Sequence, residues 1–82
     1  MVLLYPLTTE KSVAAIEKQN KITFIVEEKA TKKTIKERVE KVYAEKVKSV
    51  NIVNTFHGKK KAIVAFVKPG AAADVAAKLK II

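Results

Sequence analysis

A period of two in the apolar positions predicts a strand over residues 21–27. Ile22, Phe24 and Val26 share one face, because successive side chains of a strand point to opposite sides of its sheet. The opposite face carries three polar side chains: Lys21, Thr23 and Glu27. We expect this strand to contribute its apolar face to a core.

A helical period predicts the longest helix, which runs from Thr31 to about Ala44. Four apolar residues recur at the spacing of one buried helix face: Ile35, Val39, Val42 and Tyr43. The Thr31 hydroxyl is suited to cap this helix by accepting a hydrogen bond from a free backbone N–H. Three lysines crowd the first turns, where the helix dipole disfavours cations and nearby phosphates would offset them: Lys32, Lys33 and Lys36.

An earlier, shorter helix is expected after a cap at Thr8 or Thr9. Glu10 lies favourably in its first turn. This helix should end near Gln19 and Asn20, where asparagine tolerates the turn.

The remaining apolar runs predict three more strands and a last helix. The strands are expected over residues 2–5, stopping at Pro6, and over 47–56 and 62–68, ending before Pro69-Gly70. Residues 57–61 between the last two strands read as a hairpin turn, in which Gly58 is free to adopt a positive φ. Both faces of the 62–68 strand are apolar, so both should be partly covered. A short helix over 71–80 should turn Val75 and Leu79 inward.

These elements predict an α+β fold. Their order is strand, helix, strand, helix, strand, strand, short helix. The tight connection between the last two strands requires antiparallel pairing, which indicates a small, mostly antiparallel sheet of about four strands with helices packed against it. At 82 residues, with no linker or repeat, the chain is expected to form a single domain over residues 1–82.

The charge of the chain favours an anionic partner. Seventeen basic residues face eight acidic ones, a net charge of +9. Residues 1–30 are balanced, so the excess lies in residues 31–82, where 13 basic groups face 4 acidic ones. Lysines attract phosphates without regard to base sequence, which favours nucleic acid. An acidic protein, an anionic membrane surface and the Lys/Glu-rich surface of a heat-adapted protein remain alternatives.

The residue types present argue against catalysis. The chain has no cysteine, one histidine (His57) and two glycines, so neither a Cys-ligated zinc site nor a Gly-rich phosphate loop can form. Glu27 and Glu28 are adjacent, so in a strand their side chains point to opposite faces. They are expected to be solvent-exposed charges at a strand end and not a metal site. We expect no enzyme activity, no cofactor and no metal. No signal peptide or membrane-length apolar run is found, which predicts a cytoplasmic protein.

The most distinctive local feature is a run of three consecutive lysines in the expected hairpin: Lys59, Lys60 and Lys61. Three cations at a hairpin tip can enter a groove of folded RNA, although a solubilising loop has the same composition. Phe24 and Phe66 are expected in the core, which leaves few aromatic side chains for base stacking. The sequence therefore favours shape and phosphate contacts to structured RNA over base stacking.

An ordered series of segments resembles the universal ribosomal protein L twenty-three family. It begins with Pro6-Leu-Thr-Thr-Glu-Lys-Ser12 and continues through 20–26, 30–36, 39–43, 47–55 and 60–64. Spacing and order agree over nearly the whole chain. The closing residues 74–82 resemble the archaeal and eukaryotic branch, and the absence of a long basic extension favours an archaeal member.

The resemblance implies a structural protein of the large ribosomal subunit. Family members bind the third domain of large-subunit rRNA beside the peptide exit tunnel, among neighbouring ribosomal proteins. They form a docking surface for the signal recognition particle and the translocation channel. The loop matching Asn54 to Ala62 is shorter than in bacteria, where it reaches the tunnel wall.

Mapped onto this chain, the resemblance and the lysine pattern together give a set of candidate residues. Glu10 matches the partner-docking position. The candidate RNA contacts are Thr8, Thr9, Lys11, Ser12, Lys32, Lys33, Lys36, Asn54, His57, Lys59, Lys60 and Lys61. Two other classes stay open: a free-standing, chromatin-like protein that coats nucleic acid, and a small enzyme, for which neither an anion-binding loop nor a catalytic side chain is found.

Overall fold

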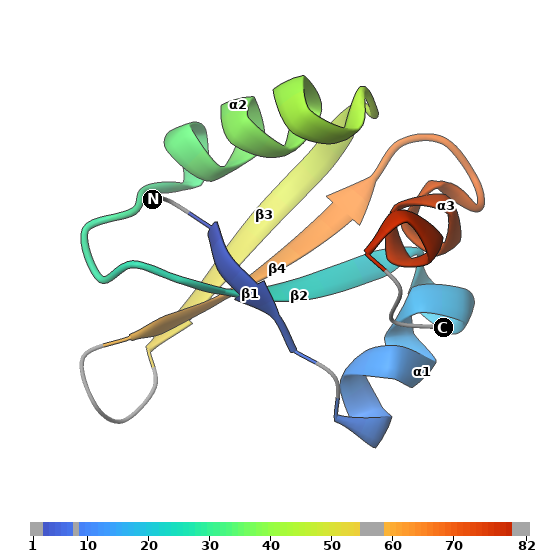
Figure 1. Ribbon diagram of the computed structural model, residues 1–82, viewed down its shortest axis with the longest axis horizontal. Coiled ribbons are helices and arrows are strands. Elements are labelled where there is room, and N and C mark those ends of the chain that lie inside the picture. The colour runs from blue at the N-terminus through green and yellow to red at the C-terminus, as the bar shows by residue number, and fades with distance from the viewer. Residues whose placement is uncertain (1–2, 8, 55–58, 80–82) are drawn as a thin grey trace.

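The computed structural model describes residues 3–7, 9–54 and 59–79 (Figure 1). In these ranges four strands and three helices follow the predicted order, which confirms the α+β class. In chain order they are β1 (Leu3–Pro6), α1 (Glu10–Gln19), β2 (Lys21–Val26), α2 (Lys32–Tyr43), β3 (Val47–Asn54), β4 (Lys60–Phe66) and α3 (Ala71–Lys78).

The strands form one antiparallel sheet in the order β1-β2-β4-β3. β2 and β4 lie at its centre, where Phe24 pairs with Ala62, and Val64 pairs with Val50 of β3. The hairpin between β3 and β4 was predicted from the chain order. The pairing of β2 with β4 was not, because no local pattern specifies which strands become neighbours after a helical crossover.

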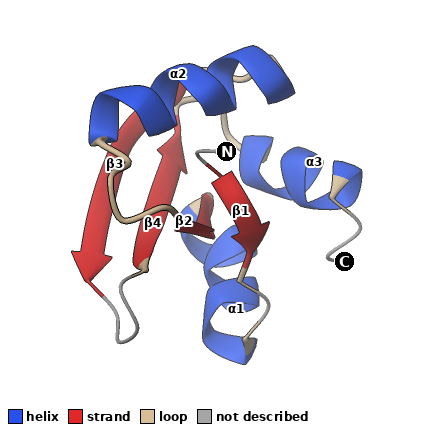
Figure 2. Ribbon diagram, turned by 60° about the vertical axis from the view of Figure 1, so that its left-hand side comes forward, coloured by secondary structure: helices blue, strands red, loops and turns tan. Residues whose placement is uncertain are grey.

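The core lies between the sheet and its helices. The predicted alternation in β2 is confirmed, since Ile22, Phe24 and Val26 are all buried. α2 lies along one side of the sheet, while α1 and α3 lie together at the end of the sheet where β2 begins (Figures 1 and 2). Each helix contributes apolar side chains to the same cluster as the strands: Ile16, Ile35, Val39, Ala71, Ala72, Val75 and Ala76.

Threonines cap the first two helices, as predicted. Thr9 is the cap of α1, and its hydroxyl accepts a hydrogen bond from the backbone N–H of Ser12 at 3.3 Å. At the start of α2, Thr31 and Thr34 form a reciprocal capping box: each hydroxyl accepts a hydrogen bond from the other's backbone N–H. Two of the donors that a helix start leaves without partners are thereby satisfied.

Asn20 joins the end of α1 to the connection between β4 and α3. Its backbone is left-handed, with φ 54° and ψ 42°, as expected for an asparagine that ends a helix. The side-chain amide donates to the carbonyl oxygens of Phe66 at 3.2 Å and Lys68 at 2.7 Å. Its oxygen accepts from the backbone N–H of Ala72, in the first turn of α3, at 2.9 Å. One side chain thus fixes two chain segments about fifty residues away in the sequence.

The predicted buried stripe of α2 is wrong at Val42, whose side chain is 56% exposed. Tyr43 is partly buried instead and stacks on Phe24, with ring centroids 6.2 Å apart and planes at 19°. Burial raises the pKa of the Tyr43 phenol above its ordinary value. The helix therefore turns a narrower face to the sheet than the four predicted positions required.

Several predicted boundaries shift by one or two residues. β1 includes Pro6, which pairs with Phe24 on an edge strand, where proline is tolerated. β4 begins at Lys60 and ends at Phe66, so Val67 is exposed and lies outside the strand. β3 is described to Asn54 and α3 to Lys78, with Leu79 partly buried. The predicted strand residues 55 and 56 and the predicted helix residue 80 lie outside the described residues.

Candidate nucleic-acid interface

The sheet has a second face, turned away from α2, and it presents ordered rows of side chains. Tyr5 pairs with Ile25, Ile25 with Lys61, and Lys61 with Val53. Paired residues share a face, so these four side chains form a row across all four strands. The next rows are Thr23, Ile63 and Asn51, and then Lys21, Ala65 and Ser49. We call the surface formed by these ten residues the open face.

The open face has a buried floor and exposed edges. Ile25, Thr23 and Ala65, in the central strands, are each at most 8% exposed. Tyr5 and Val53, at the two edges of the first row, are each 48% exposed. This face is therefore partly apolar, and its outer positions Tyr5 and Val53 are open to a partner.

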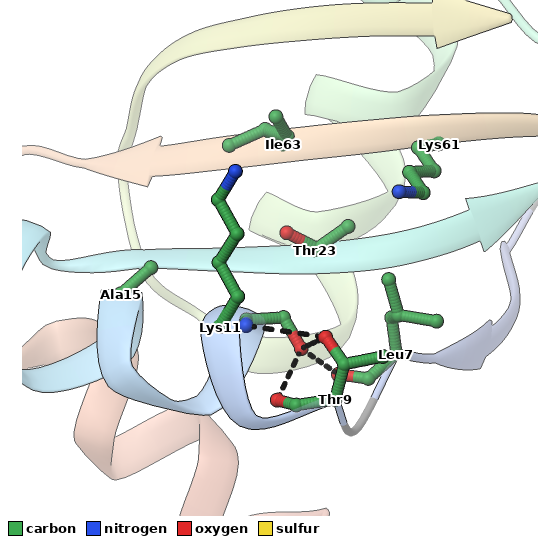
Figure 3. A pocket seen from close by; sticks show the side chains of 8 residues that line it. Leu7, Thr9, Lys11, Ala15, Thr23, Lys61 and Ile63 are labelled. Atoms are coloured by element: carbon green, nitrogen blue, oxygen red, sulfur yellow. Dashed lines mark hydrogen bonds between the residues drawn. The ribbon is translucent and has the colours of Figure 1, made fainter.

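A hollow of about 170 Å³ lies where the start of α1 meets the open face (Figure 3). The sheet supplies Thr23, Lys61 and Ile63. The connection from β1 supplies Leu7 and Thr9, and α1 itself supplies Lys11, Ser12 and Ala15. In Figure 3 the Lys11 side chain reaches across β2 toward Ile63, and Lys61 approaches from the neighbouring side. Two cations and several hydroxyls thus surround a small apolar floor, a combination that suits a phosphate and its sugar.

Ser12 plays a structural part at the edge of this hollow. Its hydroxyl is largely buried, donates to the Leu7 carbonyl at 2.9 Å and accepts from the Thr9 hydroxyl at 3.0 Å. These bonds fix the turn between β1 and α1 and thereby place Lys11 over the sheet. Of the predicted contacts in this segment, Thr9 and Lys11 are exposed, whereas the Ser12 hydroxyl is used inside the protein.

The three hairpin lysines do not lie together on a loop tip, as the sequence suggested. Lys60 and Lys61 are in β4, paired with Asn54 and Val53 of β3. Neighbouring residues of a strand point to opposite faces, so Lys61 lies on the open face while Lys60 and its partner Asn54 lie on the α2 side. Lys59 precedes the strand, with its ammonium nitrogen 5.7 Å from the centre of the Tyr5 ring.

Lys32, Lys33 and Lys36 form a second basic group at the start of α2. All three are exposed, and the first turn of α2 contains no acidic residue. In both views the start of α2 lies above the ends of β3 and β4 that lead into their connection, on the same side of the molecule (Figures 1 and 2). The predicted lysines thus occupy both faces of the sheet, toward one side of the molecule.

The family model for ribosomal protein L23 matches residues 1–78. The chain belongs to this family. Membership gives the basic surfaces a context, since ribosomal protein L23 is a structural, non-enzymatic protein of the large subunit. The resemblance noted from the sequence segments is thereby confirmed.

Of the positions predicted for this L23-family chain, Glu10 is described by the structure and two others are not. Thr8 and His57 lie outside the described residues. Glu10 is the first residue of α1 and is exposed, next to the Thr9 cap. It is accessible on the α1 side of the hollow, as a docking position must be.

Sequence reasoning missed Tyr5 and Asn51 as members of the open face. Neither residue carries a local pattern that marks it as part of a binding surface. The signal that places them together is the register of β1, β2, β4 and β3, which a single sequence does not display. Once the sheet order is known, the alternation within each strand assigns both residues to the open face.

Among residues 3–7, 9–54 and 59–79, no three His, Cys, Asp or Glu side chains gather as metal ligands would. Over the same ranges, none of the helices has the length and apolar character needed to span a membrane.

Proposed function

We propose that this L23-family chain binds large-subunit rRNA through the open face and the adjoining basic side of the molecule. The observation that carries the proposal is the convergence of Lys11, Lys59 and Lys61 on one side of the sheet. They come from α1 and β4 and from the residue preceding β4. Cations gathered on one surface neutralise neighbouring phosphates and set the register of the protein on the RNA.

The α2 lysines extend this surface around the same side of the molecule. Helix N-termini attract phosphate because their free N–H groups and dipole are positive. At α2 this tendency is reinforced by Lys32 and Lys33, with Lys60 on the same side of the sheet. An RNA fold that clasps this side of the protein would contact both groups.

In the cell, we infer that residues 1–82 act as one rRNA-binding domain in the cytoplasm. The family resemblance supports a site in the third rRNA domain, beside the peptide exit tunnel, in an archaeal ribosome. The test is preferential binding of a third-domain rRNA fragment over duplex DNA. This preference should survive at salt concentrations that abolish non-specific binding.

Glu10 is proposed as a docking position for the signal recognition particle and the translocation channel. It lies exposed at the start of α1, beside the surface assigned to rRNA. A carboxylate at a helix start is stabilised by the helix dipole, so Glu10 does not reduce the stability of the fold. Its negative charge is available to a basic partner.

The Glu10→Lys variant should therefore enter large subunits normally but bind the signal recognition particle at least several-fold more weakly, as measured by co-sedimentation with purified ribosomes. Glu17→Lys is the matched control, because Glu17 is exposed on the same helix and the charge change is identical. Equal binding by both variants would remove Glu10 from the docking site.

A further inference from the structure

Tyr5 is the feature of the open face that phosphate binding leaves unexplained. It is 48% exposed on the edge strand β1, while its neighbour in the row, Ile25, is buried. A phenol ring that is half exposed at a sheet edge covers few core side chains, so it contributes little to the stability of the fold. Its position beside Lys59, in the same cross-strand row as Lys61 on the surface proposed to face RNA, gives it a use.

The cations near the ring come from two directions. The Lys59 ammonium lies 5.7 Å from the ring centre, and Lys61 belongs to the same cross-strand row as Tyr5. A base stacked on the ring would place its phosphates within reach of both side chains. The face thus combines an aromatic platform with flanking positive charge, the arrangement that binds unpaired nucleotides on other sheets.

The contact between Lys59 and Tyr5 does not block such a base. A cation–π contact at an exposed site is weaker than base–aromatic stacking by a factor of about two to three. A nucleotide also brings a phosphate that attracts the ammonium away from the ring. Stacking together with the new ion pair therefore prevails over the contact in the free protein.

The hollow beside α1 suggests the course of the strand. Lys61 belongs both to the Tyr5 row and to the hollow, whose other cation is Lys11. Residues two apart along a strand are about 7 Å from each other, so the Tyr5 and Thr23 rows are one such step apart. A single strand that leaves the ring can place its next sugar and phosphate in the hollow.

We propose that the open face holds an unpaired RNA nucleotide, its base stacked on Tyr5 and its phosphates on Lys59 and Lys61, with the next unit beside Lys11. This rests on the proposed rRNA binding and specifies its partner as a single-stranded segment at this face. It also changes the expectation from the sequence, which favoured shape and phosphate contacts without stacking.

Tyrosine fluorescence tests the proposal directly. The chain has two tyrosines and no tryptophan, so Tyr43→Phe leaves Tyr5 as the only emitter and keeps an aromatic ring on Phe24. A riboadenylate hexamer should quench this emission on binding. A hexamer of abasic units, with the same phosphates, should bind roughly 5- to 100-fold more weakly and leave the emission unchanged.

Substitutions of Tyr5 provide the second arm. Tyr5→Leu should lose the preference for the base-containing hexamer and retain the salt dependence of binding, because no phosphate contact is removed. Tyr5→Phe should bind within about twofold of the parent, because the ring is kept. Circular dichroism melting shows whether each variant folds.

Equal binding of the riboadenylate and abasic hexamers, or unchanged affinity in Tyr5→Leu, would overturn the stacking site. So would polyglutamate that displaces the riboadenylate hexamer as well as unlabelled hexamer does, because that result would indicate a surface for any polyanion. These outcomes leave rRNA binding untouched if the third-domain fragment is still preferred over duplex DNA. Loss of that preference alone would refute the proposed function instead.

Discussion

The Asn20→Ala variant is expected to lose about 4 kcal/mol of unfolding free energy. Its side chain makes three hydrogen bonds to the backbone of Phe66, Lys68 and Ala72, each worth about 1 kcal/mol. Alanine would also have to adopt the left-handed conformation, which costs about 1 kcal/mol more than in asparagine. For a small domain this is a large share of the total stability. Urea denaturation monitored by circular dichroism measures it.

Two further variants separate the hydrogen bonds from the backbone conformation. Asn20→Gly accepts the positive φ but lacks the amide and its three hydrogen bonds, so it should still lose about 3 kcal/mol. Ala44 ends α2 in the same left-handed conformation, and its side chain cannot form a hydrogen bond. Ala44→Gly should therefore change stability by no more than about 1 kcal/mol, in the stabilising direction. A loss under 1 kcal/mol in Asn20→Ala would show that the connection to α3 does not depend on this side chain.

Removing the charges of Lys59 and Lys61 should weaken rRNA binding roughly tenfold near 0.1 M salt. The plot of log affinity against log salt should flatten by about two units, one for each lost phosphate contact. The Lys59→Gln/Lys61→Gln variant keeps long polar side chains at both positions. Fold stability should change little, because both lysines lie on the solvent side of the sheet. Filter binding to the third-domain fragment over a salt series gives both quantities.

The matched control is Lys18→Gln/Lys41→Gln, which removes the same net charge from the last turns of α1 and α2. Its affinity should fall no more than about twofold, through the general field of the protein alone. Lys32→Gln/Lys33→Gln tests the second basic group and should flatten the slope as well. If the control weakened binding as strongly as the open-face variant, the lysines would act as diffuse charge and the face would have no special part.

Features that depend on neighbouring residues could be predicted from the sequence. The Thr31 cap, the helix end at Asn20 and the buried face of β2 follow from propensity and spacing, and the structure has all three. Each depends on interactions within a few residues, which one sequence records completely. The family could be identified too, because its segments occur in order along the chain.

What could not be predicted depends on which elements become neighbours. Lys60 and Lys61 look like one cluster in the sequence, yet the pairing of β4 sends them to opposite faces. Val42 fits the apolar stripe of α2 but extends past the edge of the surface that the helix covers. Tyr5 joins Lys59 and Lys61 only through the sheet order. The three bonds of Asn20 reach residues about fifty positions away, and no local pattern indicates them.

One competition titration tests most directly whether the open face recognises a shaped RNA. Labelled third-domain rRNA fragment and generic duplex DNA compete for the protein between about 50 and 200 mM salt. We predict that the rRNA fragment is preferred and that the preference grows as salt suppresses non-specific binding to the duplex. Equal affinities that fall together would contradict this account and favour a chromatin-like protein that binds any nucleic acid through charge alone.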